Sequence, residues 1–255
     1  MTTERWIVVL GAGGTGLYMA EVIERTDGCR CGGFLDDDPS KRPEDCCGYP
    51  VLGRLGDWAS LPEEYAFVTS LYGPKSNPRL AQVVESLQIP DGRWASVVEG
   101  QAWVSRHASI GIGCFVGPGS VIEPMATLGP RCALLGNVYI AHHVRLAEYV
   151  VCANSASVAG GVSIGRATYI GANATIREYL AVGGGHSSEW ARSSALTCPT
   201  DISSSETLLA PSGPTLTPAR QCSISFPCGK IQSNAAHREQ FAAGFSSIGC
   251  HCRAA

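Results

Sequence analysis

The sequence has little charge, few aromatic side chains and no long apolar run. Charged residues make up 16% of its 255 residues and aromatic residues 7%, and a formal net charge of −3 leaves no basic surface for nucleic acid. No stretch approaches the roughly 18 apolar residues that a membrane span requires. The apolar run over residues 7–10 is too short for the core of a secretion signal. We therefore expect a soluble, cytoplasmic protein with no nucleic-acid partner and no membrane span.

Twelve cysteines would suit a disulfide scaffold in a secreted chain. Because no secretion signal is recognised and the cytoplasm keeps thiols reduced, we expect scattered free thiols instead. Cys250, His251 and Cys252 could contact a metal, but their spacing is not that of zinc-binding cysteine pairs. No metal site is expected.

Residues 1–95 alternate between strand and helix patterns. The apolar run over residues 7–10 is typical of a parallel strand buried on both faces, and a helical pattern follows it. Further strands are predicted over residues 33–35 and 66–69, and a later helix over residues 80–87. These elements predict a small, Rossmann-like α/β domain.

From Val104 onward an aliphatic residue, once replaced by cysteine, recurs at every sixth position without an insertion. The positions are Val104, Ile110, Val116, Ile122, Leu128, Leu134, Ile140, Leu146, Cys152, Val158, Ile164, Ile170, Ile176 and Val182. A six-residue period is typical of hexapeptide repeats, in which three short strands make one coil of a parallel β-helix. The aliphatic residues should point into the prism, and the glycines that often follow them should ease the corner turns. Residues 96–185 are predicted to form this domain.

The repeat stops abruptly after residue 185. Residues 186–255 are rich in Ser, Pro, Thr and Cys and have no amphipathic period, so an irregular or disordered tail is predicted. The abrupt change suggests the hypothesis that the reading frame alters near residues 183–185. Repeat-coding triplets in another frame of the DNA would support that hypothesis.

The segment GAGGTG over residues 11–16 lies between the first predicted strand and the first predicted helix. Its glycines allow a phosphate to approach the amide groups at the helix N-terminus. Asp36 lies at the end of the next predicted strand, where a ribose-binding acid often occurs. The pattern favours nucleotide binding over a purely structural turn. Because no dehydrogenase substrate domain follows, a nucleotide-linked substrate is favoured over NAD.

His142 and His143 occupy the third and fourth places of one hexapeptide, at a predicted corner of the coil. A histidine there can keep one ring nitrogen free, and imidazole chemistry suits general base catalysis near neutral pH. The alternative is a pair of ordinary surface histidines.

Together these features resemble a specific group of proteins. Residues 11–16, FLDD over residues 34–37, GYPVLG over residues 48–53 and IAH over residues 140–142 resemble the bacterial sugar acyltransferases. That family includes the bacillosamine-pathway N-acetyltransferase and the sialic acid O-acetyltransferases. The resemblance covers residues 5 to about 183, and it implies a Rossmann-like domain followed by a left-handed parallel β-helix, assembled as a homotrimer.

The resemblance also implies roles for individual residues. His142 matches the family's general base, and His143 stands where the family commonly has an acid. Gly13, Gly14, Thr15, Asp36 and Asp37 match positions that bind the nucleotide-sugar. Gly160 matches a glycine beside the acyl donor acetyl-CoA, and it follows His142 by three hexapeptides, which make one full coil.

We therefore expect an acyltransferase that moves acetyl from acetyl-CoA to the amino group of a nucleotide-activated sugar, with His142 as the base. A backbone N–H near Gly160 would stabilise the oxyanion. The alternatives are O-acetylation of a sialic-acid-like sugar, a non-catalytic relative that binds a nucleotide-sugar but lacks a complete acetyl-CoA site, and an NAD-dependent oxidoreductase.

Overall fold

The computed structural model describes residues 4–74 and 77–184, which belong to one compact unit. The predicted tail over residues 186–255 lies outside the described residues, as do Cys250, His251 and Cys252. No helix in the described part of the chain is long and apolar enough to cross a bilayer.

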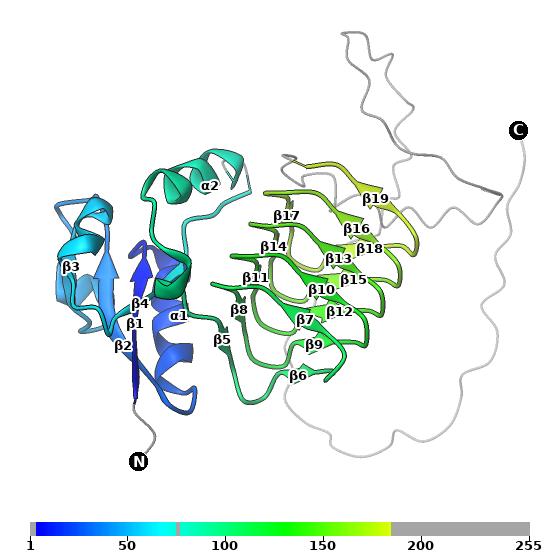
Figure 1. The fold of residues 1–255 in the computed structure, drawn as a ribbon, viewed down its shortest axis with the longest axis horizontal. Coiled ribbons are helices and arrows are strands. Elements are labelled where there is room, and N and C mark those ends of the chain that lie inside the picture. Colours follow the sequence, from blue (N-terminus) through cyan, green and yellow to red (C-terminus); the bar gives the residue numbers. More distant parts are fainter. Residues whose placement is uncertain (1–3, 75–76, 185–255) are drawn as a thin grey trace, which may run out of the picture. The chain divides into compact units, whose positions relative to one another are not determined.

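The N-terminal part is a four-stranded parallel sheet with helices beside it (Figure 1). Its strands lie in the order β3-β2-β1-β4. The elements are β1 (Arg5–Leu10), α1 (Gly14–Glu24), β2 (Cys29–Leu35), η1 (Pro43–Cys46), β3 (Val51–Gly53), η2 (Leu55–Ser60), β4 (Ala66–Thr69), α2 (Asn77–Ser86) and η3 (Asp91–Arg93). The strand predicted over residues 66–69 is confirmed, and the other predicted strands are parts of longer ones. The later helix begins at Asn77, slightly before its predicted start.

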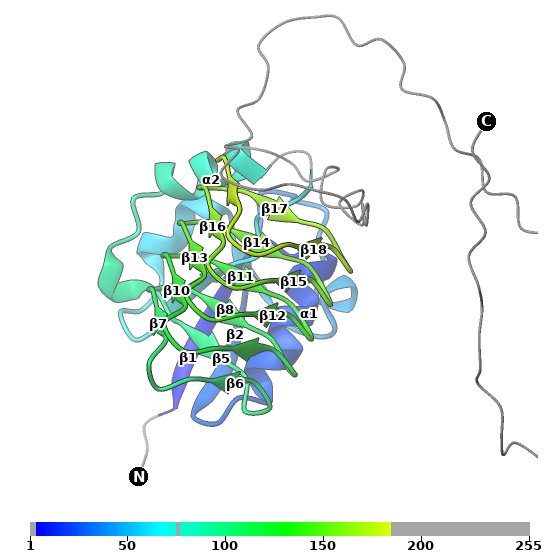
Figure 2. The same ribbon diagram turned by 90° about the vertical axis from the view of Figure 1, so that its right-hand side faces the viewer.

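Two-residue strands then wind into a triangular prism of three parallel sheets (Figures 1 and 2). The first sheet holds β5 (Val97–Val98), β8 (Phe115–Val116), β11 (Ala133–Leu134), β14 (Val151–Cys152) and β17 (Tyr169–Ile170). The second sheet holds β6 (Trp103–Val104), β9 (Val121–Ile122), β12 (Tyr139–Ile140), β15 (Ser157–Val158) and β18 (Thr175–Ile176). The third sheet holds β7 (Ser109–Ile110), β10 (Thr127–Leu128), β13 (Arg145–Leu146), β16 (Ser163–Ile164) and β19 (Ala181–Val182). This is the left-handed parallel β-helix of hexapeptide repeats.

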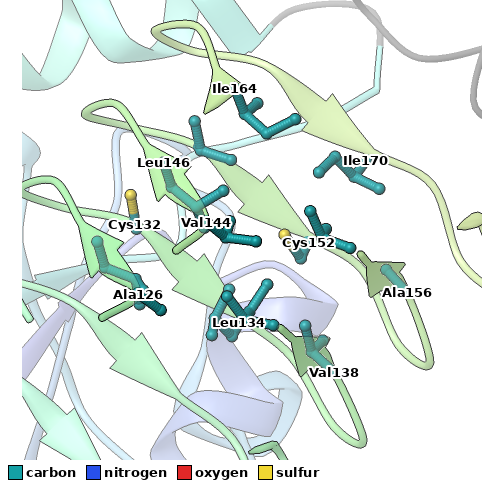
Figure 3. Close-up of a cluster of buried hydrophobic side chains, with 14 of the residues drawn as sticks. Ala126, Cys132, Leu134, Val138, Val144, Leu146, Cys152, Ala156, Ile164 and Ile170 are labelled. Atoms are coloured by element: carbon teal, nitrogen blue, oxygen red, sulfur yellow. The ribbon is translucent and has the colours of Figure 1, made fainter. Parts of the chain in front are cut away.

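The repeating aliphatic residues fill the prism, as predicted. Each is the second residue of its strand, and Ile122, Leu134, Ile140, Val158 and Ile170 are fully buried. Figure 3 shows side chains of this cluster, which come from the three sheets and meet inside the coil. Full burial of such a side chain contributes about 1.5–3 kcal/mol. Strands of consecutive coils pair three hexapeptides apart, for example Tyr139 with Ser157, so each corner lies directly above the corner of the coil before it.

The glycines after the aliphatic residues have a different role from the predicted one. Gly111, Gly129 and Gly165 do not have a positive φ. A Cβ atom on Gly129 would lie 2.7 Å from the carbonyl carbon of Ala147 in the next coil, so glycine is required there by close stacking. The left-handed conformation falls nearer the middle of each turn, for example at Asn137, with φ 57°.

The α/β part packs against the first sheet. Met19 of α1 shares a buried cluster with the outward-facing Phe115, Ala133 and Val151. The ring of Tyr18 also contacts Phe115 edge to face, with 6.0 Å between the ring centroids. Helix α1 is therefore held against one sheet of the prism.

Candidate functional site

The glycine-rich loop gives α1 an open N-terminus. Gly13 is the N-cap residue, and no side chain caps the first turn. The first amides of a helix lack partners within the helix and attract anions. A Cβ atom on Gly13 or Gly14 would meet nothing within 4 Å, so a ligand can reach these backbone amides. Gly16 is different, because a Cβ atom there would lie 2.1 Å from the carbonyl oxygen of Gly11 and only glycine fits.

Asp36 and Asp37 follow β2, but only Asp36 contacts the loop. One Asp36 carboxylate oxygen accepts the Ala12 N–H at 2.6 Å, and the other accepts the Asp38 N–H at 2.8 Å. Asp37 instead accepts the Leu55 N–H of η2 at 3.0 Å. Both acids line a cavity of about 320 Å³ together with Lys41. Gly13, Gly14 and Thr15 lie outside its lining.

A second cavity, of about 430 Å³, was not predicted from the sequence. It lies where α1 meets the edge between the first and second sheets. Its lining is uncharged and comprises Tyr18, Gln101, Pro118, Gly119, Gly136, Asn137 and Asn154. We call it the Tyr18 cavity. Within the described part of the chain the Tyr18 hydroxyl is buried and has no hydrogen-bond partner. Burial raises the pKa of Tyr18, and the nearby carboxylate of Glu99 adds to the effect.

His142 and His143 form the turn after β12, at the edge between the second and third sheets. Both side chains are exposed, and His143 has a φ of 60°. The turns of successive coils are joined by backbone hydrogen bonds. The His143 N–H donates to the Pro124 carbonyl at 3.2 Å, and the Gly161 N–H donates to the His142 carbonyl at 3.0 Å. The edge is therefore a stack of hydrogen-bonded turns.

The imidazole of His142 lies directly against Gly160 of the next coil. A Cβ atom on Gly160 would lie 2.6 Å from Cε1 and 2.8 Å from Nε2 of His142. Real Cβ atoms do not approach so closely, so the ring occupies space that only a glycine leaves open. The structure thus brings together the two residues that the hexapeptide register predicted to be neighbours.

The two histidine rings contact each other through the same kind of nitrogen. Nδ1 of His142 lies 3.2 Å from Nδ1 of His143, and the ring planes are at 84°. In such a contact one nitrogen donates a proton and the other accepts it, so the tautomers of the two rings are linked.

Glu123 of the preceding coil is a further neighbour of His142 that was not predicted from the sequence. One of its carboxylate oxygens accepts a hydrogen bond from the backbone N–H of His142 at 2.8 Å, and the other accepts a hydrogen bond from the Tyr139 hydroxyl at 2.5 Å. The hydrogen bond from Tyr139 is the main cause that lowers the pKa of Glu123, and His142 adds to it. The same bond raises the pKa of Tyr139.

Large apolar side chains surround this edge on the protein surface. Trp103 and Tyr139 of the second sheet are 55% and 39% exposed, and Met125 and Tyr179, on turns in the same stack as His143, are 56% and 79% exposed. We call these four residues the apolar patch. Exposed apolar side chains of this size on one face and its edge make that face a candidate interaction surface.

The predicted site residues form two groups in one chain. Asp36 lies at the glycine loop, and that loop leads into the helix that packs on the first sheet. His142, His143 and Gly160 lie on the other side of the prism from that helix, at the edge between the second and third sheets. Among the described residues no cluster of three or more His, Cys, Asp or Glu side chains could hold a metal ion.

Residues 6–74 match the family described as the PglD N-terminal domain. The chain is similar to the acetyltransferase domain of PglB from Neisseria gonorrhoeae FA1090, solved with acetyl coenzyme A, with 25% identity and a TM-score of 0.61 over 71% of this chain and 86% of that one. It shares its fold with a mutant of GDP-perosamine N-acetyl transferase from Caulobacter crescentus, solved with CoA and GDP-perosamine. That similarity has 21% identity and a TM-score of 0.60 over 69% of this chain and 82% of that one.

No curated protein matches the chain in sequence. The structural similarity nevertheless spans both parts of the molecule, since it extends far beyond the matched N-terminal residues. A PglD-type N-terminal domain and a hexapeptide β-helix thus occur together in this chain, and this combination supports its resemblance to the bacterial sugar acyltransferases with hexapeptide repeats.

Proposed function

We propose that the protein transfers the acetyl group of acetyl-CoA to the amino group of a nucleotide-activated sugar. The observation that carries this proposal is the exposed His142 imidazole lying against Gly160. An exposed imidazole beside bare backbone has room for both a thioester and an attacking amine. The similarity to the acetyltransferase domain of PglB makes acetyl transfer the chemistry that this arrangement best serves.

His142 accepts the proton of the attacking amine at Nε2. This requires a proton on Nδ1, which then donates to Nδ1 of His143. The amine nitrogen forms its bond to the thioester carbonyl carbon, and the carbon–sulfur bond breaks as CoA leaves as a thiolate. The proton held by His142 passes to that thiolate. His143 thus selects the tautomer of the base, and no covalent enzyme intermediate is needed.

Acetyl-CoA lies beside Gly160 in this proposal. The PglB acetyltransferase domain is solved with acetyl coenzyme A, which supports the same donor here. The absence of a side chain at Gly160 lets the His142 ring lie in this place, beside the thioester. Backbone N–H groups of this coil stabilise the oxyanion, and such a donor contributes about 10²–10³-fold to the rate.

The nucleotide-sugar lies along α1. The free amides at Gly13, Gly14 and Thr15 bind its phosphates. Asp36 holds the loop in place through Ala12, and Asp37 faces the adjoining cavity beside Lys41, where the nucleoside lies.

The sugar occupies the Tyr18 cavity. Tyr18 follows Gly14 by one turn of α1 and lies on the same face of the helix. The cavity that Tyr18 lines therefore adjoins the phosphate-binding amides. Its uncharged lining suits a hydroxylated ring. The unpartnered Tyr18 hydroxyl gains a hydrogen bond when the sugar enters.

The complete site needs a second copy of the chain. The Tyr18 cavity lies at one edge of the second sheet and His142 at the other. The apolar patch lies between these edges and beside His142, where a neighbouring copy would cover it. In a homotrimer the His142 edge of one protomer meets the Tyr18 cavity of the next.

Thiol release from acetyl-CoA tests the function against a panel of nucleotide-linked amino sugars and their hydroxyl counterparts. Turnover with the amino sugars alone is expected. Turnover with the hydroxyl sugars alone would contradict an amino acceptor. Binding of nucleotide-sugars without binding of acetyl-CoA by calorimetry would contradict acetyl transfer altogether.

A further inference from the structure

We propose that Glu123 is a positioning residue for His142, and that this carboxylate from the preceding coil supplies the negative charge that the base needs. The inference rests on the proposed function, because it assigns a role beside the same base. His143 follows the base directly in the chain and cannot carry a negative charge, so the partner has to come from elsewhere in the fold.

The coil geometry places Glu123 at the base. Ile122 pairs with Ile140 across one coil, so Glu123 directly follows β9 just as the turn of His142 follows β12. The carboxylate of Glu123 therefore reaches the turn above it. One of its oxygens accepts the His142 N–H at 2.8 Å, which fixes the backbone from which the imidazole projects.

Tyr139 holds the same carboxylate from the other side. Its hydroxyl donates to the second oxygen of Glu123 at 2.5 Å, so each oxygen has a donor. Both donors favour the ionised carboxylate, and the pKa of Glu123 is lowered accordingly. Glu123 is thus an oriented anion at every pH at which an imidazole could act as a base.

The neighbours of the His142 imidazole along its stack of turns carry different charges. His143 lies beside His142, Gly160 contacts it from the coil above without a charge, and Glu123 lies below it. Farther along the same stack of turns the register places Arg106 two coils below and Glu178 two coils above. When His142 takes the amine's proton, Glu123 is the nearest anion in this set. Its field stabilises the imidazolium that forms as the bond to the acetyl carbon is made.

Glu123→Gln tests the inference, because it keeps the shape of the side chain and removes its charge. The imidazolium then loses a nearby negative charge, so the acid limb of kcat/KM against pH should move to lower pH, and kcat on the plateau should fall about threefold to tenfold. Glu123→Asp keeps the charge and should return the limb toward its original position. Glu178→Gln is the matched control and should leave the limb unmoved.

The outcomes separate the two proposals. A Glu123→Gln protein that folds and loses activity with an unmoved limb would overturn the inference, because a purely structural role gives that result. A limb that moves equally in Glu178→Gln would also overturn it. A wild-type protein that shows no turnover with any acceptor would instead overturn the proposed function, and this inference with it. If Glu123→Gln does not fold, Glu123→Ala decides, because it also removes the charge: the limb should then move to lower pH, and an unmoved limb would overturn the inference.

Discussion

The imidazole of His142 lies against the Cα atom of Gly160, one coil later in the β-helix. A Cβ atom at residue 160 would be 2.6 Å from Cε1 of the ring and 3.2 Å from Nδ1. The ring could escape such a clash only by rotating away from its present place. A single methyl group at Gly160 is therefore expected to displace the base while leaving the coil intact.

Gly160→Ala is expected to lower kcat by about 100-fold, because a misplacement of the order of 1 Å can have that effect. The unfolding free energy should change by less than about 0.5 kcal/mol, since the clash is with the movable end of an exposed side chain. Steady-state turnover and urea denaturation check the two expectations. Gly100→Ala is the matched control, because a Cβ atom there meets nothing within 4 Å. Equal activity of the two variants would contradict the proposed geometry.

Stability should depend on pH through Glu123. Its pKa lies below the ordinary 4.5 in the folded chain, so its contribution is present above about pH 4.5 and is lost as the pH falls through the folded-state pKa. The difference in unfolding free energy between the wild type and Glu123→Gln should therefore shrink as the solution is acidified from neutral pH. Urea denaturation at a series of pH values measures it. A difference that stays constant would show that the hydrogen bonds to Tyr139 and His142 do not favour the ionised carboxylate.

Tyr18→Phe should weaken binding of the nucleotide-sugar without weakening binding of the nucleoside diphosphate. If the sugar lies in the Tyr18 cavity, the variant should bind the nucleotide-sugar about threefold to tenfold more weakly and the bare nucleoside diphosphate equally well. The free protein should become more stable, because an unpartnered buried hydroxyl costs about 1–3 kcal/mol. Calorimetry and urea denaturation give both readouts. Equal weakening for both ligands would place the sugar elsewhere.

Two inactive variants should restore activity together. His142→Ala lacks the base, and Asp36→Ala lacks the support of the glycine loop through Ala12. We propose that His142 of one protomer acts on the nucleotide-sugar bound by the next. In a mixed oligomer of the two variants, co-expressed with different tags, some sites should therefore combine an intact His142 from one chain with an intact Asp36 from the other. Turnover by oligomers purified through both tags checks this. Activity no higher than that of the separate variants would contradict a site shared between copies.

The six-residue period explains why much of the β-helix could be predicted. It determines which side chains point inward, and a coil of three hexapeptides brings Gly160 over His142 without any knowledge of side-chain conformations. The glycine loop and Asp36 were likewise predicted as neighbours, because parallel strands end at the same edge of a sheet.

The missed residues depend on features that a period does not encode. Glu123 reaches His142 only because its side chain extends toward the next turn, and Tyr139 then holds it there. Tyr18 became part of a cavity because α1 packs on the first sheet, which no pattern in α1 itself reveals. Asp37 was predicted to bind the nucleotide-sugar together with Asp36, and that role stays a prediction; its carboxylate accepts the Leu55 N–H, a contact that the sequence did not indicate.

Single-turnover acetyl transfer by the wild type and by His142→Ala tests the central claim most directly. With saturating acetyl-CoA and a nucleotide-linked amino sugar, the variant should react about 10²–10⁴ times more slowly, the usual contribution of a general base. Its affinity for the nucleotide-sugar, measured by calorimetry, should be unchanged. Equal rates of acetyl transfer in the two proteins would contradict the account.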